Sequence, residues 1–456
     1  MDLKPLFSPR SVAVIGVSLG NDRHPANVIF NKNHLRHRVK VFAVNPKGGS
    51  LLGETVYKDV GSIPEKVDLA VVAVRADLVP GVIRQCVDAG TAGAAVISGG
   101  FAEVGRQDLQ EEIVKIARDA DFPLIGPNCL GVYAPAYVDT FFLPAERMIR
   151  PEQGNVALVS QSGGILVDQM IKFAEEGVGI SIAVSIGNKA LVRELDLLRH
   201  LSEDENTDVI AFYVEGFSKG EGRRFVLEAV KSKKPVIVVK SGKSEAGSRA
   251  VSSHTASLAG DYRVFSSVLA QYGVVEAKNE LELVSFCEAL SCYKTPPLCG
   301  RVGIITGSGG HGAMAVDACS DLGIQVPGLS GPLKETVHQS LSESVAQIAS
   351  VTNPIDLTGS AVDDDFVNTA VALASSDEVD CLLLLLLPYL PGITSDLGAR
   401  LSSVYQRLQK PVVAYVPRLE KYRMLIEGFE LNRVPVAPSI EGAVLMIEAL
   451  RRCQPC

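Results

Sequence analysis

The stretch Val156-Ala-Leu-Val-Ser-Gln-Ser-Gly-Gly164 has a counterpart in Val302-Gly-Ile-Ile-Thr-Gly-Ser-Gly-Gly310. Each combines a short apolar strand, a polar residue and a Ser-Gly-Gly turn that opens a helix. The two turns are 146 residues apart (308 − 162), which is close to the length of one domain. The pair therefore favours two α/β domains of the same build.

Similar apolar, β-branched runs recur along the chain, and amphipathic stretches such as 109–120 lie between them. Strands that alternate with helices indicate βαβ units, a parallel sheet and right-handed crossovers. The runs are 11–16, 40–44, 68–74, 93–98, 122–125, 156–160, 180–184, 209–215, 235–240, 301–306, 379–387 and 410–416. Polar, proline-containing connections at 144–154 and 293–300 predict three doubly wound parallel-sheet domains of the α/β class, over residues 1–150, 151–295 and 296–456.

Composition excludes several classes of protein. The 456 residues are 47% hydrophobic with a net charge of −8, and only 6% are aromatic. This excludes long disorder and gives no basic or base-stacking surface for nucleic acid. The longest apolar run, 381–387, is far shorter than the ~20 residues of a membrane span. Nine scattered cysteines favour reduced thiols in a cytoplasmic protein, and the pair Cys453 and Cys456 has no second pair to complete a metal site.

The first glycine turn follows the first predicted strand. It contains Gly16 and Gly20, but Ser18 stands where a dinucleotide fingerprint needs glycine. The second strand ends in Asn45-Pro46-Lys47, where a nicotinamide site needs a carboxylate. The amide and the cation disfavour NAD and suit a ligand with an extra phosphate, such as coenzyme A. A plain strand-to-helix turn is the alternative.

The turns at Ser162 and Ser308 are candidate phosphate sites, because helix N-termini present unpaired amides and partial positive charge. The polar segment 240–260 follows a predicted buried strand and is expected to be a functional loop. Its only imidazole, His254, is a candidate nucleophile, although a loop histidine is often an ordinary surface residue. Glu215 ends another predicted strand, where it could orient a histidine ring or be a solvated acid.

These residues resemble the α subunit of ADP-forming acyl-CoA synthetases of the acetate–CoA ligase type, relatives of succinyl-CoA synthetase. The resemblance covers residues 1 to about 450. Its motifs are Ser253-His254-Thr255-Ala256-Ser257-Leu258-Ala259-Gly260, Gly126-Pro127-Asn128-Cys129, Ser160-Gln161-Ser162-Gly163 and Asn353-Pro354-Ile355-Asp356. It implies a Rossmann-like CoA-binding domain followed by two flavodoxin-like ligase domains.

The resemblance also implies roles for individual residues. His254 would be transiently phosphorylated, with Glu215 as its partner. Coenzyme A would contact Gly16, Ser18, Asn45, Pro46, Lys47, Val74, Arg75, Ser98, Gly99 and Asn128. The phosphoryl group would be held by Ser160, Gln161, Ser162, Gly163 and Gly164 and by Ser308, Gly309 and Gly310. His311 departs from the family pattern and is either a further phosphate contact or a helix-start residue.

The expected reaction interconverts acyl-CoA, ADP and phosphate with a carboxylic acid, CoA and ATP. Three α/β domains leave no room for an ATP-grasp domain, so ATP or ADP and Mg²⁺ would bind a β subunit, in an α₂β₂ assembly by family resemblance. Isolated chain should bind CoA without making acyl-CoA from ATP and acid. The alternatives are a non-catalytic CoA or acyl-CoA sensor and, least favoured, a nicotinamide oxidoreductase. The acyl group and the choice between ADP and GDP stay open.

Overall fold

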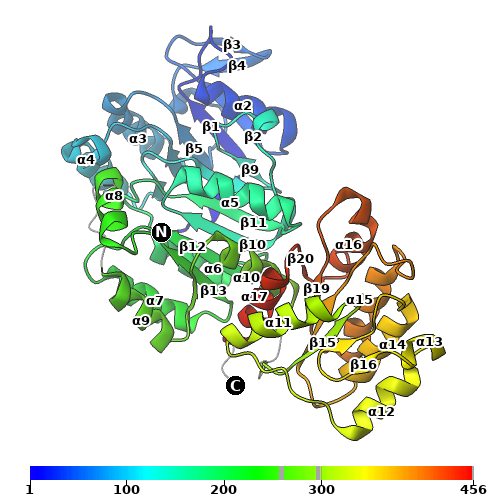
Figure 1. The fold of residues 1–456 in the computed structure, drawn as a ribbon. Helices are drawn as coiled ribbons and strands as arrows, with labels where there is room; N and C mark the ends of the chain where they lie inside the picture. The colour runs from blue at the N-terminus through cyan, green and yellow to red at the C-terminus, as the bar shows by residue number, and fades with distance from the viewer. Residues whose placement is uncertain (256–260, 294–297, 299, 454–456) are drawn as a thin grey trace. The chain divides into compact units, whose positions relative to one another are not determined.

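The structure is a computed structural model, and it describes residues 1–255, 261–293, 298 and 300–453, without the side chains of 252–255. The chain divides into two compact units, Met1–Lys278 and Asn279–Cys456. The first unit holds two sheets and the second holds one, each flanked by helices (Figure 1). The predicted α/β class is confirmed.

The first sheet has the spatial order β3-β4-β2-β1-β5-β6-β7. Its strands are β1 (Ser11–Ile15), β2 (Lys40–Val44), β3 (Gly49–Leu51), β4 (Glu54–Tyr57), β5 (Leu69–Val72), β6 (Gly93–Val96) and β7 (Leu124–Ile125). They run parallel except for the β3–β4 hairpin. From β1 the chain proceeds outward to β2 on one side and later to β5 on the other, so the strand order reverses between β1 and β5.

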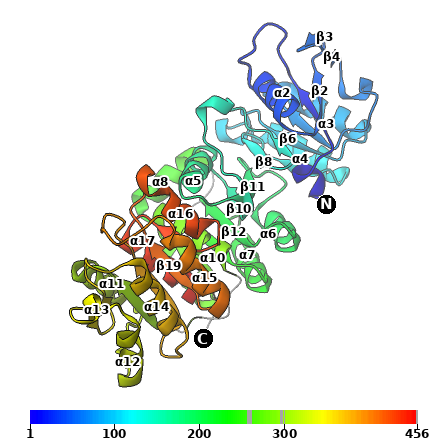
Figure 2. The same cartoon turned by 90° about the vertical axis from the view of Figure 1, so that its right-hand side faces the viewer.

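Helices cover this sheet on its two faces (Figure 2). They are α1 (Lys4–Phe7), α2 (Pro25–Arg36), α3 (Val79–Asp88) and α4 (Gln107–Asp119), with short 3₁₀ turns η1 (Val60–Ser62), η2 (Ala76–Leu78), η3 (Ala102–Val104) and η4 (Ala145–Arg147). In α4 the buried residues Leu109, Ile113 and Ala117 recur every four positions. This spacing places them on one helical face, which packs against the sheet.

The second sheet has the order β14-β13-β12-β10-β11-β8-β9. Its strands are β8 (Gly131–Ala134), β9 (Val138–Asp139), β10 (Gln153–Ser160), β11 (Ile180–Ser185), β12 (Val209–Val214), β13 (Val236–Lys240) and β14 (Val275–Ala277). Strands β10 to β14 are parallel, while β8 and β9 add an antiparallel edge next to β11. The strand order reverses between β10 and β12.

The helices of this sheet are α5 (Gly163–Glu175), α6 (Glu194–Glu203), α7 (Glu221–Lys231), α8 (Glu245–Thr255) and α9 (Tyr262–Gln271). Helix α8 corrects the expectation of a loop over 240–260. The Ser244 hydroxyl accepts a hydrogen bond from the Gly247 amide at 3.0 Å, and such a cap satisfies an otherwise unpaired amide of the first turn. Residues 256–260 of the predicted loop lie outside the described residues.

The second unit has the strand order β16-β17-β15-β18-β19-β20. The strands are β15 (Val302–Thr306), β16 (Ser350–Val351), β17 (Ile355–Asp356), β18 (Cys381–Leu385), β19 (Val412–Tyr415) and β20 (Val436–Ala437). The helices are α10 (Glu280–Cys292), α11 (Gly309–Asp321), α12 (Gly331–Ser340), α13 (Glu343–Ala346), α14 (Asp363–Ala374), α15 (Leu397–Leu408), α16 (Arg423–Glu430) and α17 (Ile440–Arg452), with the 3₁₀ turn η5 (Glu420–Tyr422). Helix α10 packs against α17 and so belongs to this unit.

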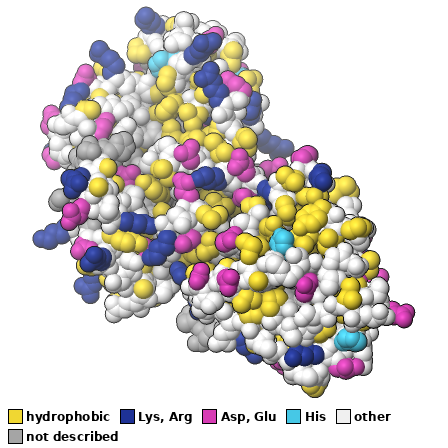
Figure 3. All heavy atoms as spheres, in the orientation of Figure 1, with side chains coloured by type: hydrophobic (Ala, Val, Ile, Leu, Met, Phe, Trp, Pro, Cys, Tyr) yellow, Lys and Arg dark blue, Asp and Glu magenta, His cyan; other side chains and the backbone are white. Residues whose placement is uncertain are grey.

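The cores of both units are apolar, and the central strands β1, β5, β15 and β18 are buried along their whole length. Side chains of both charge signs are interspersed on the face shown in Figure 3. Within the described part of the chain, no helix is long and apolar enough to cross a bilayer. In the same residues no group of three potential ligands from His, Cys, Asp and Glu could hold a metal ion.

Candidate functional site

Two cavities of the first unit lie at the carboxyl ends of its parallel strands. The first cavity, of about 470 Å³, is lined by Gly16, His24, Pro25, Ala73, Val74, Arg75, Ile97, Ser98 and Phe142. The second cavity, of about 620 Å³, is lined by Ile97, Gly99, Asn128, Cys129, Leu130, Phe142, Leu143, Gln161, Ser162, Gly163, Gly164, Val167, Ser185, Gly187, Asn188 and Lys189. Ile97 and Phe142 line both cavities, so the two cavities adjoin. Their lining residues come from both sheets of the first unit.

The first cavity lies where the strand order of the first sheet reverses, which is the usual ligand position in open α/β sheets. Gly16 follows β1 and approaches the backbone after β5 so closely that a Cβ would lie 2.4 Å from the Ala73 carbonyl oxygen. Its φ of +103° also favours glycine. The Arg75 side chain supplies the only Lys or Arg among the described residues that line this cavity.

Four predicted CoA residues lie outside the lining of both cavities. Ser18 and Asn45 support the turn instead. The Ser18 amide donates to Asn27 Oδ1 at 2.7 Å, and Asn45 Nδ2 donates to the Val17 carbonyl at 2.7 Å. Pro46 and Lys47 follow Asn45, whose Oδ1 accepts from the Lys47 amide at 2.9 Å. These contacts hold the ends of β1 and β2 together.

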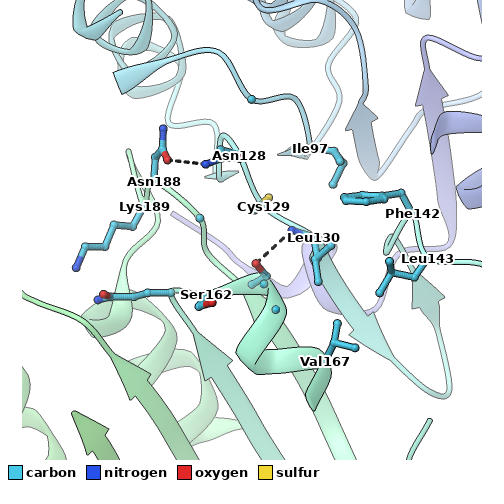
Figure 4. Close-up of a pocket in the computed structure, with 16 residues that line it drawn as sticks. Ile97, Asn128, Cys129, Leu130, Phe142, Leu143, Ser162, Val167, Asn188 and Lys189 are labelled. Atoms are coloured by element: carbon cyan, nitrogen blue, oxygen red, sulfur yellow. Dashed lines mark hydrogen bonds between the residues drawn. The ribbon is translucent and has the colours of Figure 1, made fainter. Parts of the chain in front are cut away.

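The second cavity has an apolar side and a polar side, as Figure 4 shows. The apolar side chains that gather on one side are Ile97, Leu130, Phe142, Leu143 and Val167. The polar residues Asn128, Ser162, Asn188 and Lys189 lie on the other. The cavity can therefore take a ligand with a flexible apolar part and an anionic end.

The N-terminus of α5 opens into the second cavity. The Ser162 hydroxyl accepts from the Ile165 amide at 3.4 Å, and the buried Ser160 hydroxyl accepts from the Ser162 amide at 3.1 Å. Gly164 has open space where a Cβ would stand. The amides at this helix start, together with the helix dipole, form a site for an anion.

Asn128 and Asn188 connect the two sheets at the rim of the second cavity. Asn128 Nδ2 lies 3.3 Å from Asn188 Oδ1 (Figure 4), and Asn188 Nδ2 donates to Glu103 Oε2 at 2.5 Å. Burial acts to raise the pKa of Glu103, but hydrogen bonds from Asn188 and the Gly100 amide together lower it below its usual value. Glu103 therefore stays ionised and holds Asn188 in place.

Cys129 lies between these amides and the apolar side. Its thiol lies 3.3 Å from the Val96 carbonyl oxygen, to which it donates. Burial raises the pKa of this thiol to about 12. A neutral, hydrogen-bonded thiol packs as a small apolar group and is a poor nucleophile.

Glu215 follows β12 directly and is buried, outside the lining of both cavities. Its amide donates to Gln161 Oε1 at 2.7 Å, and its carbonyl accepts from Lys240 Nζ at 2.7 Å. Burial lowers the pKa of Lys240, and the charge of Glu215 acts in the opposite direction. The structure thus brings Glu215 together with the predicted phosphate residue Gln161.

The remaining predicted residues belong to the second unit or have side chains outside the described residues. The His254 backbone belongs to α8, but its side chain lies outside the described residues. Ser308, Gly309 and Gly310 belong to the second unit, where Ser308 precedes α11. His311 Nδ1 lies 3.1 Å from the Ser308 hydroxyl, so His311 contacts the start of its own helix.

Sequence reasoning missed several residues of the cavities. His24 and Pro25 line the first cavity, and Gly187, Asn188 and Lys189 line the second. The last three lie within four residues after the end of strand β11, so the same strand-end argument that selected Glu215 would have found them. The apolar residues Leu130, Phe142, Leu143 and Val167 carry no such signal, because apolar side chains are common throughout the chain.

Comparisons with known proteins show which domains the chain contains. Residues 10–135 match the family model described as a CoA binding domain, and residues 153–290 match that of a succinyl-CoA ligase like flavodoxin domain. A solved structure from Ca. Korarchaeum cryptofilum, a dinucleotide forming acetyl-coenzyme A synthetase 1 in complex with phosphate and ADP, has a TM-score of 0.88 and 33% identity. That match covers 99% of this chain and 96% of the other.

Two curated relatives differ in length. An ADP-forming acetate–CoA ligase I of Archaeoglobus fulgidus is 38% identical over 85% of this chain, which spans 55% of that relative. The α subunit of an ADP-forming acetate–CoA ligase I of Pyrococcus furiosus is 35% identical, over 99% of this chain and 97% of the subunit. The chain therefore belongs to the family of the α subunits of ADP-forming acetate–CoA ligases.

Proposed function

We propose that this chain is the CoA-binding and phosphoryl-relay subunit of an ADP-forming acyl-CoA synthetase. It would interconvert acyl-CoA, phosphate and ADP with carboxylic acid, CoA and ATP. The observation that carries the proposal is the pair of adjoining cavities, which leads from the glycine turn after β1 to the N-terminus of α5. A ligand with phosphates at one end and a reactive thiol at the other suits this path.

Coenzyme A would lie with its phosphates near Gly16 and Arg75 and its pantetheine arm past Ile97 and Phe142. Close backbone approach at Gly16 and the cation of Arg75 suit phosphate groups. The thiol end would then reach the second cavity near Asn128. Ser18, Asn45, Pro46 and Lys47 would shape the turn or contact the outer part of the ligand.

Phosphate would bind at Ser162, Gly163 and Gly164. One of its oxygens attacks the thioester carbonyl carbon, the carbon–sulfur bond breaks, and the departing sulfur takes the phosphate proton. The acyl phosphate then transfers its phosphoryl group to a ring nitrogen of His254, which releases the carboxylate. Splitting one condensation into successive displacements lowers each barrier. Glu215 would orient the imidazole, as a carboxylate does for other catalytic histidines.

A partner would complete the reaction. We infer a β subunit with an ATP-grasp domain that binds ADP or ATP with Mg²⁺, in an α₂β₂ assembly. The α-subunit name of the Pyrococcus relative supports a partner. Ser308, Gly309 and Gly310 at the start of α11 would supply the second helix N-terminus for the phosphoryl group. The soluble substrates fit a cytoplasmic location.

The phosphoryl relay gives a direct test on the full chain. Incubation with acetyl-CoA and ³²P-labelled phosphate should produce acid-labile, base-stable label, and His254→Ala should abolish that label while CoA affinity stays unchanged. His338→Ala is the matched control, because His338 lies in α12 of the second unit. Label that persists in the His254→Ala variant would refute the role of His254.

The same experiment separates the enzyme from a CoA sensor. A sensor would bind CoA and acetyl-CoA but incorporate no phosphate, with or without a β subunit. The ligase relatives favour the enzyme.

A further inference from the structure

The turn that carries Glu215 is held by a buried polar cluster of Gln161, Lys189 and Glu194. Gln161 follows β10 and Glu215 follows β12, the two strands between which the order of the second sheet reverses. Lys189 follows β11, and Glu194 is the first residue of α6. The segments that follow three strands therefore meet at one turn, and two of them, through Gln161 and Lys189, also line the second cavity.

Gln161 uses both ends of its amide on the backbone of that turn. Its Oε1 accepts from the amides of Glu215 at 2.7 Å and Gly216 at 3.2 Å, and its Nε2 donates to the Gly216 carbonyl at 2.9 Å. The same Nε2 also donates to Glu194 Oε1. A side-chain amide that bridges donor and acceptor of one turn fixes that turn in a single orientation.

Lys189 reinforces the turn through the same two acceptors, Glu194 Oε1 and the Gly216 carbonyl oxygen. Its Nζ lies 2.7 Å from Glu194 Oε1 and 2.5 Å from the Gly216 carbonyl oxygen, to which it donates. The backbone of Lys189 has a φ of +45°, a conformation that a lysine keeps only where its surroundings demand it. Lys189 also lines the second cavity, so the cluster borders that cavity.

The Glu194 carboxylate accepts hydrogen bonds from both Gln161 Nε2 and Lys189 Nζ. Its side chain is fully buried, and its position at the first turn of α6 places the carboxylate in the favourable field of the helix dipole. We propose that Glu194, Lys189 and Gln161 are positioning residues that fix the Glu215 turn for the phosphoryl transfer to His254. This inference rests on the proposed function and assigns Gln161 to the turn rather than to the phosphate.

The test uses the full chain, acetyl-CoA and ³²P-labelled phosphate. Glu194→Ala should lower the labelling rate at saturating phosphate at least tenfold, while the dissociation constant for CoA changes less than twofold. Glu194→Gln keeps an acceptor for both donors and should recover most of the rate. A selective loss of rate with this rescue is the signature of positioning, because a general loss of folded protein would lower CoA binding in parallel.

Glu448→Ala is the matched control. Glu448 is also a buried acid in a helix, α17 of the second unit, and pairs with Arg451 at 2.7 Å. It should label at the wild-type rate per folded molecule. Equal loss in the Glu448→Ala and Glu194→Ala variants, or a wild-type rate in Glu194→Ala, would overturn the proposal.

A second variant covers the case in which Glu194→Ala does not fold. Lys189→Met combined with Glu194→Gln removes both charges at once, so no buried ion is left unpaired. It deletes the contact of Lys189 with Gly216, and we expect the same selective loss of labelling rate. Wild-type labelling in this double variant would overturn the cluster's role. A wild-type chain that binds CoA but never labels would instead refute the proposed relay, and the inference with it.

Discussion

Gly16 is the single residue on which the first cavity depends most directly. A Cβ at this position would lie 2.4 Å from the Ala73 carbonyl oxygen, and the backbone φ of +103° disfavours any other residue. Gly16→Ala should therefore weaken CoA binding at least tenfold, about 1.4 kcal/mol, as measured by titration calorimetry. Gly53→Ala is the control, because Gly53 has a φ of +84° but nothing within 4 Å of its added Cβ. Equal CoA affinity in both variants would contradict this role of Gly16.

Some site residues could be predicted from their neighbours in the sequence, and others could not because their contacts are far away in the chain. Gly16 and Ser162 could be predicted because each follows an apolar strand within a few residues. Glu194 could not, since its burial and its contacts with Gln161 and Lys189 arise only when three strand ends meet. The predicted phosphate role of Gln161 stays untested, while its hydrogen bonds join it to the Glu215 turn.

Among the helices, α8 is one that the local sequence did not predict. Segment 240–260 is rich in small polar residues, which favour turns. This composition therefore predicted a loop where the structure has a helix. Its start depends on the Ser244 hydroxyl, 3.0 Å from the Gly247 amide nitrogen. The capping serine is visible in the sequence, but Ser, Gly and Thr are weak helix formers.

Loss of this cap should loosen α8. Ser244→Ala is expected to cost about 1 kcal/mol of local helix stability, seen as faster hydrogen exchange of the amides of residues 247–251. Ser330→Ala removes an equivalent cap on α12, where the hydroxyl accepts from Leu333 at 3.3 Å, and should leave exchange in α8 unchanged. Unaltered exchange in the Ser244→Ala variant would show that the cap contributes nothing.

At the scale of the first unit, a buried ion cluster joins the layer of the first sheet to the edge of the second. Asp139 at the end of β9 lies 2.9 Å from Lys32 Nζ of α2 and 3.0 Å from Arg150 Nε. Asn33 of α2 also donates to the Asp139 carbonyl at 2.7 Å. Burial lowers the pKa of Lys32 to about 8, and the charge of Asp139 acts in the opposite direction.

Asp139→Asn should destabilise the fold by about 3–5 kcal/mol, because it leaves two buried cations without their anion. The pKa of Lys32 would then fall further, so the unfolded chain binds more protons than the folded chain up to the ordinary lysine value. The unfolding free energy of this variant should therefore begin to rise at a pH below about 8 and continue to rise toward the ordinary lysine pKa. Denaturant titrations across that pH range measure the free energy of unfolding.

Glu65→Gln is the control, because it breaks the exposed Lys40–Glu65 pair. It should change the free energy of unfolding by less than about 1 kcal/mol. An equally small effect for Asp139→Asn would contradict the prediction.

By itself, the sequence determined the α/β class, most central strands and the strand-end position of the site. These follow from the pattern of apolar and polar residues close together in the chain, as in the predicted strand 40–44, which has the bounds of β2. Only the tertiary structure decided that β8 and β9 join the second sheet and that α10 packs with α17. It alone also brought Lys189 and Glu194 to the Glu215 turn. Short edge strands and buried ion pairs gain their stability from partners far along the chain, and no local pattern records which partner that is.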